Sequence, residues 1–155
     1  MHNIEQQGWR GVFLHFRNCG EIPNRLDRHY HIGDTGDLMN VMSIIRNREP
    51  KVEISGIGFS LGGNVLLKWC GQMGARCPLN AAIAVSAPFK LKQSVEMVHH
   101  AFFSRLYERY LLHYMKKSVR RKFAGRKTPP INLDDLEHYN SFLQFDYHVT
   151  TKLHG

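Results

Sequence analysis

The sequence predicts an α/β protein in which parallel strands alternate with helices. Short apolar segments rich in strand-forming residues occur at 11–16, 52–59 and 81–85. Segments with the apolar spacing of helices lie between them, at 38–45 and 61–73. This alternation is typical of a parallel sheet whose faces are covered by helices. The chain has 155 residues, of which 43% are hydrophobic, and this is enough for one domain.

The first strand is expected at Gly11–Phe16, and a polar loop follows it over 17–36. Apolar residues then recur at helical spacing, at Leu38, Val41, Met42 and Ile45. Asp34 or Thr35 can cap the helix that this spacing predicts, because both side chains offer an oxygen to its free backbone N–H groups.

The second strand, at 52–59, contains the small residues Ser55, Gly56 and Gly58. The helix that follows has apolar residues four positions apart, at Leu61, Val65, Trp69 and Met73. A third strand is expected at 81–85, where the sequence is entirely apolar.

Beyond Pro88 the chain is predicted to be helical. An apolar stripe at helical spacing comprises Phe103, Leu106, Tyr107, Tyr110, Leu111 and Tyr114. Such a stripe predicts core packing, with Arg105, Glu108 and Arg109 on the solvent side. After a break at Pro129-Pro130, Asn132 is expected to cap a further helix.

The net charge of +8 is concentrated in one part of the chain. The window 90–127 holds eleven basic and two acidic residues, and its densest part is 115–127. A solvated face or a helix C-terminus explains such a run, since cations are favoured where a helix ends. The alternative is an anionic membrane surface, bound through Lys116, Lys117, Arg120, Arg121 and Lys122. No nucleic-acid partner is expected, because no nucleic-acid fold signature is present.

The cysteines, histidines and apolar runs exclude several protein classes. Three cysteines, Cys19, Cys70 and Cys77, do not describe a disulfide scaffold. No apolar run approaches the roughly 20 residues of a membrane span, and Met1–Glu5 lacks signal-peptide features. We therefore expect a cytoplasmic protein, which would be peripheral to the membrane under the alternative reading of the basic run. Neither His29-x-His31 nor Cys70 with Cys77 supplies the three or four spaced ligands of a zinc site, so we expect no metal and no cofactor.

One motif carries chemistry. Gly58-Phe59-Ser60-Leu61-Gly62 reads G-x-S-x-G, and it falls between a predicted strand and a predicted helix. This is the setting of a nucleophile elbow, a sharp turn that needs small residues at Gly58 and Gly62, with Gly63 easing the packing. Ser60 is then the nucleophile, and the Leu61 N–H donates to the developing oxyanion. The alternatives are a structural glycine-rich turn or a phosphate-binding turn, which here lacks the P-loop lysine.

Several motifs, in the same order along the chain, resemble YheT-like α/β-hydrolases. They are His15–Gly20, Pro23–Arg25, Tyr30–Thr35, Gly58–Asn64, Val85–Phe89, Tyr107–Leu112 and Pro130–Leu133. The resemblance implies a partial α/β-hydrolase core with the elbow at 1–89. It implies a helical, basic, lid-like insertion at 90–155 in the same domain. It also implies a serine hydrolase of carboxylic esters, either short-chain or acylglycerol esters. The loop at Asn18–Glu21 departs from the family pattern.

The resemblance places no triad acid and no triad histidine in this chain. In this fold the acid and the histidine follow the serine on later strands, and they would lie beyond the point that matches Gly155. In the sheet of this fold, another strand lies between the first strand and the strand that leads into the elbow. The resemblance implies that this chain lacks that strand. It also implies that the chain lacks the second backbone N–H that would donate to the oxyanion. Local acids and histidines are interpreted as surface or capping residues: Asp134, Asp135, Asp146, His99, His100, His113, His138, His148 and His154.

Two alternatives to an active esterase therefore remain. The chain can be a truncated, catalytically inactive remnant, because a serine hydroxyl without a base is a poor nucleophile. It can also be a basic module that binds a membrane surface.

Overall fold

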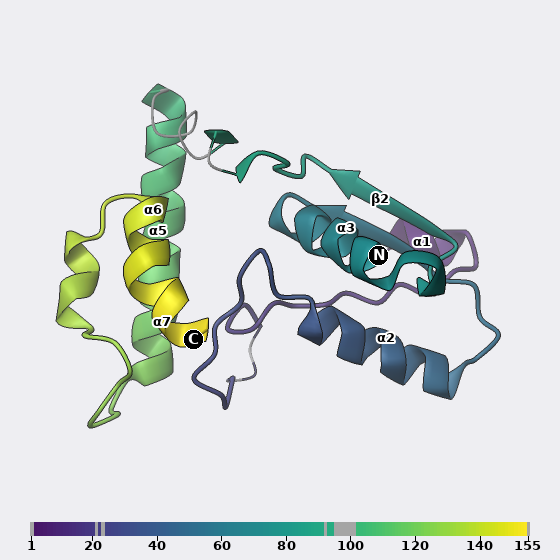
Figure 1. The fold of residues 1–155 in the computed structure, drawn as a ribbon, viewed down its shortest axis with the longest axis horizontal. Helices are drawn as coiled ribbons and strands as arrows, with labels where there is room; N and C mark the ends of the chain where they lie inside the picture. Colours follow the sequence, from purple (N-terminus) through teal and green to yellow (C-terminus); the bar gives the residue numbers. More distant parts are fainter. Residues whose placement is uncertain (1, 21, 23, 92, 95–101, 155) are drawn as a thin grey trace.

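The computed structural model describes residues 2–20, 22, 24–91, 93–94 and 102–154. Glu21, Pro23, His99 and His100, which figure in the sequence motifs and candidates, lie outside the described residues. The chain forms two groups of elements (Figure 1). The first group comprises α1 (His2–Gln6), α2 (Gly36–Arg48), β1 (Ser55–Phe59), α3 (Leu61–Met73), η1 (Gly74–Arg76) and β2 (Ala81–Val85). The second comprises α5 (Phe102–Phe123), η2 (Asp134–His138), α6 (Phe142–Phe145), η3 (Asp146–Thr150) and α7 (Thr151–His154).

The two strands confirm the predicted α/β class. β1 pairs with β2 in parallel, from Ser55 opposite Ala81 to Phe59 opposite Val85. α3 connects the strands and packs on them, and α2 packs on α3 (Figure 1). Leu66 and Trp69 of α3 form a buried core with Met42 of α2. The observed bounds of α3 and β2 are those expected from the sequence, whereas β1 begins at residue 55 and not at 52.

The segment 11–16 is not a strand in the structure. It has no strand assignment and pairs with neither β1 nor β2, which are the strands of the sheet within the described residues. Val12 and Phe13 are exposed. The physical reason is the lack of an adjacent strand edge, since an extended segment becomes part of a sheet only through hydrogen bonds to a neighbour. Strand-forming residues at 11–16 are therefore not sufficient to make this segment a strand.

Four residues of the apolar stripe of α5 face solvent, so the core packing predicted for them is wrong. Leu111 of the stripe is half-buried, and the side chain of Phe103 lies outside the described part of the structure. Leu106, Tyr107, Tyr110 and Tyr114 are 63%, 59%, 56% and 51% exposed. The buried side of α5 instead carries Glu108, Leu112, Val119 and Phe123. The short elements after α5 pack on that side, and the resulting core comprises Leu112, Val119, Phe123, Ile131, Leu136, Phe145, Val149 and Leu153. Helical spacing identifies an apolar face, but it does not say which face another element covers.

Two short polar contacts shape this second group. Asn132 accepts a hydrogen bond from the Asp134 N–H at 3.1 Å, as expected of a cap, but the element that follows is a single 3₁₀ segment. The buried Glu108 carboxylate accepts from the Phe142 N–H at 2.9 Å, at the start of α6.

The division of the chain into two parts at residue 89 stays a prediction. Within the described residues, no helix has the length and hydropathy that crossing a membrane requires.

The basic run is mostly engaged within the molecule. Lys116 and Arg120 form ion pairs with Glu137 of η2. Arg121 donates to the Asn18 carbonyl oxygen, and Lys122 donates to the backbone of the same loop. Of the five basic residues expected to face a membrane, Lys117 has no such partner among the described residues. The run therefore joins the second group to the loop at 17–36, since backbone carbonyls there accept from its cations.

Candidate active site

Ser60 lies at the carboxyl end of β1, directly before α3. Its backbone N–H donates to the Val85 carbonyl oxygen at 2.8 Å, which continues the β1–β2 ladder by one bond. Its own carbonyl oxygen accepts from the Asn64 N–H at 3.2 Å, which begins α3. The residue is exposed. Ser60 is thus the single residue at which the chain changes from strand to helix.

The backbone of Ser60 is strained. Its φ of 49° and ψ of −119° lie where residues with a side chain rarely occur. Such conformations cost about 1–3 kcal/mol and persist where the surrounding structure holds them. The hydroxyl makes no cap hydrogen bond to α3. Ser86 follows β2 as Ser60 follows β1, and its φ is also positive, at 53°. Because Phe59 and Val85 are register partners, the two strained serines lie side by side at one edge of the sheet.

Two glycines make the sharp turn sterically feasible. A Cβ on Gly58 would lie 2.5 Å from the Gly62 carbonyl oxygen and 2.7 Å from the Gly63 Cα. A Cβ on Gly63 would lie 2.9 Å from the Gly58 carbonyl oxygen. Gly62 differs, since a Cβ there would meet only the ring of Phe16, at 4.0 Å. The close approach of β1 to α3 therefore needs glycine at 58 and 63, and position 62 has room for a methyl group.

The Leu61 N–H lies in the first turn of α3, where backbone N–H groups have no partner within the helix. The positive end of the helix dipole adds to the attraction of an anion there. Asn64 holds the facing loop in place, because its side-chain amide donates to the Pro88 carbonyl oxygen at 2.8 Å. A carbonyl oxygen that develops negative charge beside Ser60 can therefore accept a hydrogen bond from this position.

No acid or base contacts the Ser60 hydroxyl in the part of the chain that the structure describes. Among the described residues, the Ser60 hydroxyl forms no hydrogen bond with an Asp, Glu or His side chain. The nearest-looking pair in sequence, Asp146 and His148, lies in η3, where Asp146 accepts from Thr150 at 2.8 Å. His148 stacks on Tyr139 at 4.8 Å. These two groups thus have structural partners in the second group of elements.

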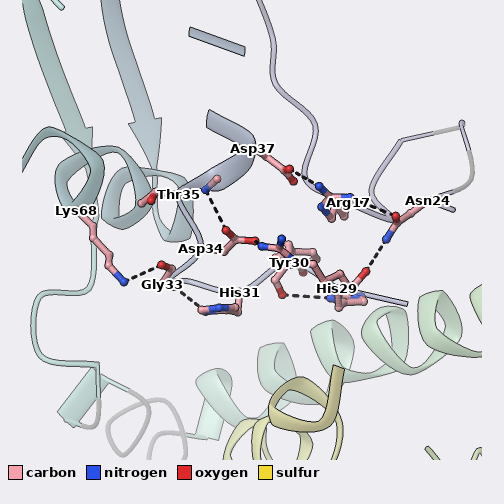
Figure 2. Close-up of polar contacts among 12 residues, drawn as sticks. Arg17, Asn24, His29, Tyr30, His31, Gly33, Asp34, Thr35, Asp37 and Lys68 are labelled. Carbon is pink, nitrogen blue, oxygen red and sulfur yellow. Dashed lines mark hydrogen bonds and ion pairs between the residues drawn. The ribbon is translucent and has the colours of Figure 1, made fainter. Parts of the chain in front are cut away.

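A polar network that sequence reasoning did not single out fixes the loop before α2 (Figure 2). Arg17 pairs with Asp37, the first acid of α2. Asp34 accepts from the Gly36 N–H at 3.0 Å, so it and not Thr35 supplies the side-chain cap of α2. Lys68 of α3 donates to the Gly33 carbonyl oxygen at 2.7 Å. The sequence feature that points to this network is the motif at 30–35, because Gly33 and Asp34 of that motif form these contacts.

Burial perturbs several groups near this loop. It lowers the pKa of His29, whose Nε2 is buried without a hydrogen-bond partner among the described atoms. Burial also raises the pKa of Tyr30, to about 12. The rings of His31 and His154 meet edge to face, with centroids 4.1 Å apart. Within the described residues no three His, Cys, Asp or Glu side chains gather as metal ligands, and His29 and His31 point to different partners (Figure 2).

Comparisons with known proteins identify relatives of this chain. YheT of Escherichia coli strain K12, which carries the name of an esterase, is 38% identical over 97% of the chain and 44% of its own length. The mouse protein named phospholipase ABHD3 is 26% identical over the whole chain and 38% of its own length. The Saccharomyces cerevisiae protein named monoacylglycerol lipase is 28% identical over 81% of the chain and 29% of its own length.

No family model matches the chain. No solved structure matches it either. The chain spans less than half the length of the relatives named above. The aligned relatives carry the names of ester hydrolases, and the structure has the parallel α/β arrangement expected of them. Over the part that it spans, the chain is similar in sequence to YheT-like α/β-hydrolases and has the α/β class expected of them.

Proposed function

We propose that Ser60 is the nucleophile of a serine hydrolase that cleaves carboxylic esters of the short-chain or acylglycerol class. The supporting observation is the exposed, strained Ser60 in a turn where Gly58 and Gly63 let β1 and α3 meet. Strain of this kind occurs at functional sites, where a side chain must be held in one direction. The names of the relatives, which include an esterase and a monoacylglycerol lipase, support the ester substrate.

The reaction follows from the groups at the turn. The Ser60 hydroxyl oxygen bonds to the ester carbonyl carbon, and the Leu61 N–H donates to the resulting oxyanion. The carbon–oxygen bond to the alcohol then breaks, which leaves an acyl group on Ser60, and water releases the acid. A base must take the hydroxyl proton and return it to the leaving alcohol. The relatives contain further segments that do not align with this chain. We propose that segments equivalent to these supply the base, its acid partner and the second oxyanion N–H.

Labelling with a fluorophosphonate, read by intact mass, tests this function. The 155-residue chain is compared with a chimera that adds the segments of the Escherichia coli relative that it does not cover. We expect one adduct on the chimera. Ser60→Ala should abolish it, and Ser86→Ala should keep it, because Ser86 is the matched strained serine after the neighbouring strand. An adduct that survives Ser60→Ala contradicts the assignment.

The two versions of the chain also separate an active hydrolase from an inactive remnant. Labelling of the chimera alone would mean that the 155 residues hold an assembled elbow without a base. Labelling of both would mean that a group within the 155 residues activates Ser60. A folded chimera that neither labels nor hydrolyses an ester would contradict the hydrolase proposal itself.

We propose membrane attachment in the cytoplasm as a second function. The exposed cations Arg105, Arg109 and Lys117 and the exposed Leu106, Tyr107, Tyr110 and Tyr114 support it, because tyrosine rings and basic side chains suit a membrane–water interface. Flotation with vesicles of anionic and of neutral lipid tests this. We expect binding to the anionic vesicles that weakens with salt, and equal flotation with neutral vesicles contradicts a basic surface.

A further inference from the structure

A cavity of about 580 Å³ lies between α5 and the segment around η2. It belongs to the second group of elements and lies apart from the turn at Ser60. Its volume falls within the range of roughly 300–1,000 Å³ of small-molecule sites. The cavity is partly open to solvent, so a ligand can enter without a movement of the chain.

The lining of this cavity is strongly basic. It is contributed mainly by one side of α5, which supplies Arg105, Arg109, His113, Lys116, Lys117 and Arg120. The two acids of the lining are Glu108 and Glu137. Glu108 is buried and directs one oxygen to the Phe142 N–H. Glu137 is already paired with Arg120 and Lys116. Arg105, Arg109 and Lys117 form no ion pair with any described residue, so the cavity keeps a positive excess.

Unpaired cations that face one cavity repel one another, and a bound anion removes this repulsion. Arg105 and Arg109 are four residues apart on α5, so their side chains lie on one face of the helix. Two guanidinium forks offer parallel N–H donors that match the oxygens of a phosphate group. Tyr139 and Asn140 also line the cavity, and the Tyr139 hydroxyl adds a neutral donor.

We propose that this cavity binds the phosphate group of a phosphorylated ligand, with Arg105, Arg109 and Lys117 as the main contacts. A tetrahedral dianion engages several donors at once, whereas a chloride or a single carboxylate engages fewer. The proposal does not depend on Ser60, and it gives the protein a second binding site.

The phosphate can come from a soluble compound or from a lipid headgroup. The outward face of α5 bears on this choice, because exposed Leu106, Tyr110 and Tyr114 lie on the same helix as the basic lining. Tyrosine rings at the level of lipid headgroups would hold that helix beside membrane phosphates. The shared chemistry is the phosphate group, and the experiment has one arm for each source.

The soluble arm uses the full ¹⁵N-labelled chain and inorganic phosphate, with acetate at equal ionic strength as the control anion. We expect saturable shifts of the backbone amides of 105–120 and 137–140 with phosphate and weaker ones with acetate. The lipid arm uses sedimentation with vesicles that contain phosphatidic acid and with vesicles of neutral phosphatidylcholine. If inorganic phosphate gives saturable shifts and also displaces the chain from phosphatidic acid vesicles, the natural ligand is assigned as a lipid headgroup. If inorganic phosphate gives saturable shifts but the chain does not bind the vesicles, the natural ligand is assigned as a soluble phosphorylated compound.

A charge-matched pair of variants separates a site from diffuse attraction. R105Q/R109Q removes two cations from the cavity. R48Q/R76Q removes two exposed cations from α2 and η1. We expect R105Q/R109Q to weaken phosphate binding about tenfold or more, since it removes two charge-assisted hydrogen-bond donors, and R48Q/R76Q to leave it within about twofold.

The proposal fails if phosphate gives no saturable shifts, or if the two double variants weaken binding equally. Thermal unfolding of both variants checks that they are folded. Lys117→Gln changes one exposed side chain, so it tests the site even if R105Q/R109Q does not fold. A wild-type affinity in K117Q together with an unfolded R105Q/R109Q would also overturn the assignment of these contacts.

Discussion

Gly58 and Gly62 meet so closely that a Cβ on Gly58 would lie 2.5 Å from the Gly62 carbonyl oxygen. The contact joins the carboxyl end of β1 to the first turn of α3, on either side of Ser60. Because the obstacle is backbone and not the end of a flexible side chain, it cannot move aside cheaply. The geometry of the turn at Ser60 therefore depends on the absence of a side chain at position 58.

Gly58→Ala should lower the free energy of unfolding by about 1–3 kcal/mol, as expected of a methyl group forced into a packed site. Gly71→Ala is the matched control in α3, because a Cβ there meets nothing within 4 Å. Alanine is favoured over glycine inside a helix, so G71A should raise stability by roughly 0.5–1 kcal/mol. Urea unfolding measures both, and a neutral G58A would show that the turn can relax.

Ser60→Gly should be more stable than Ser60→Ala by about 1 kcal/mol or more. Glycine adopts the φ of 49° with little strain, whereas alanine keeps the Cβ and the strain. Both variants remove the hydroxyl, so both should lose any labelling by fluorophosphonate. Denaturant midpoints of the two variants give the difference. Equal midpoints would mean that the backbone at Ser60 is not strained in solution.

Arg46→Met should destabilise the protein by about 1–3 kcal/mol. Arg46 donates to the carbonyl oxygens of Pro50 and Val52, at 3.3 and 2.5 Å, and to that of Pro78. These bonds hold the two segments that lead into β1 and β2, and their loss leaves several acceptors unsatisfied. Arg48→Met is the control two residues later, at an exposed position, and it should change stability by less than about 0.5 kcal/mol.

Stability should fall as the pH is lowered from about 7.5 to about 5. Burial lowers the pKa of His29 below its ordinary value of 6.5. The hydrogen bond with the Tyr30 carbonyl oxygen opposes this in part, and the charges of His154 and Lys122 lower the pKa further. Burial, and then His31, lowers the pKa of His154 as well. The unfolded chain then binds protons that the folded chain does not, so the free energy of unfolding decreases as the pH falls.

His29→Gln should flatten this dependence, and it is measured by urea unfolding at several pH values. His2→Gln is the control, because the side chain of His2 is exposed and meets water in both states. A slope that persists in H29Q would assign the pH dependence to other groups.

The two faces of α5 should respond differently to truncation. Leu112→Ala removes a buried side chain, 2% exposed, and should cost about 2–5 kcal/mol. Tyr110→Ala acts on the outward face and should change stability by less than about 1 kcal/mol. If Y110A proved as costly as L112A in thermal unfolding, the outward face would be covered in solution.

Much of the first group of elements could be predicted from the sequence. The periodicity of 61–73 and the apolar run of 81–85 fixed α3 and β2, because local side-chain patterns decide where a helix or strand can form. The motif at 58–62 likewise located the strand-to-helix turn. The segment 11–16 shows the limit, since its composition suits a strand but no neighbouring edge pairs with it.

The sequence by itself determined the α/β class, the position of Ser60 in its turn and the concentration of positive charge at 90–127. These are local properties, set by residue type and spacing. The tertiary structure alone decided which face of α5 is buried, which cations of the run are paired within the molecule and that Gly63, more than Gly62, allows the turn. Each of these depends on what lies across from a residue in space, and spacing along one chain carries no record of the facing surface.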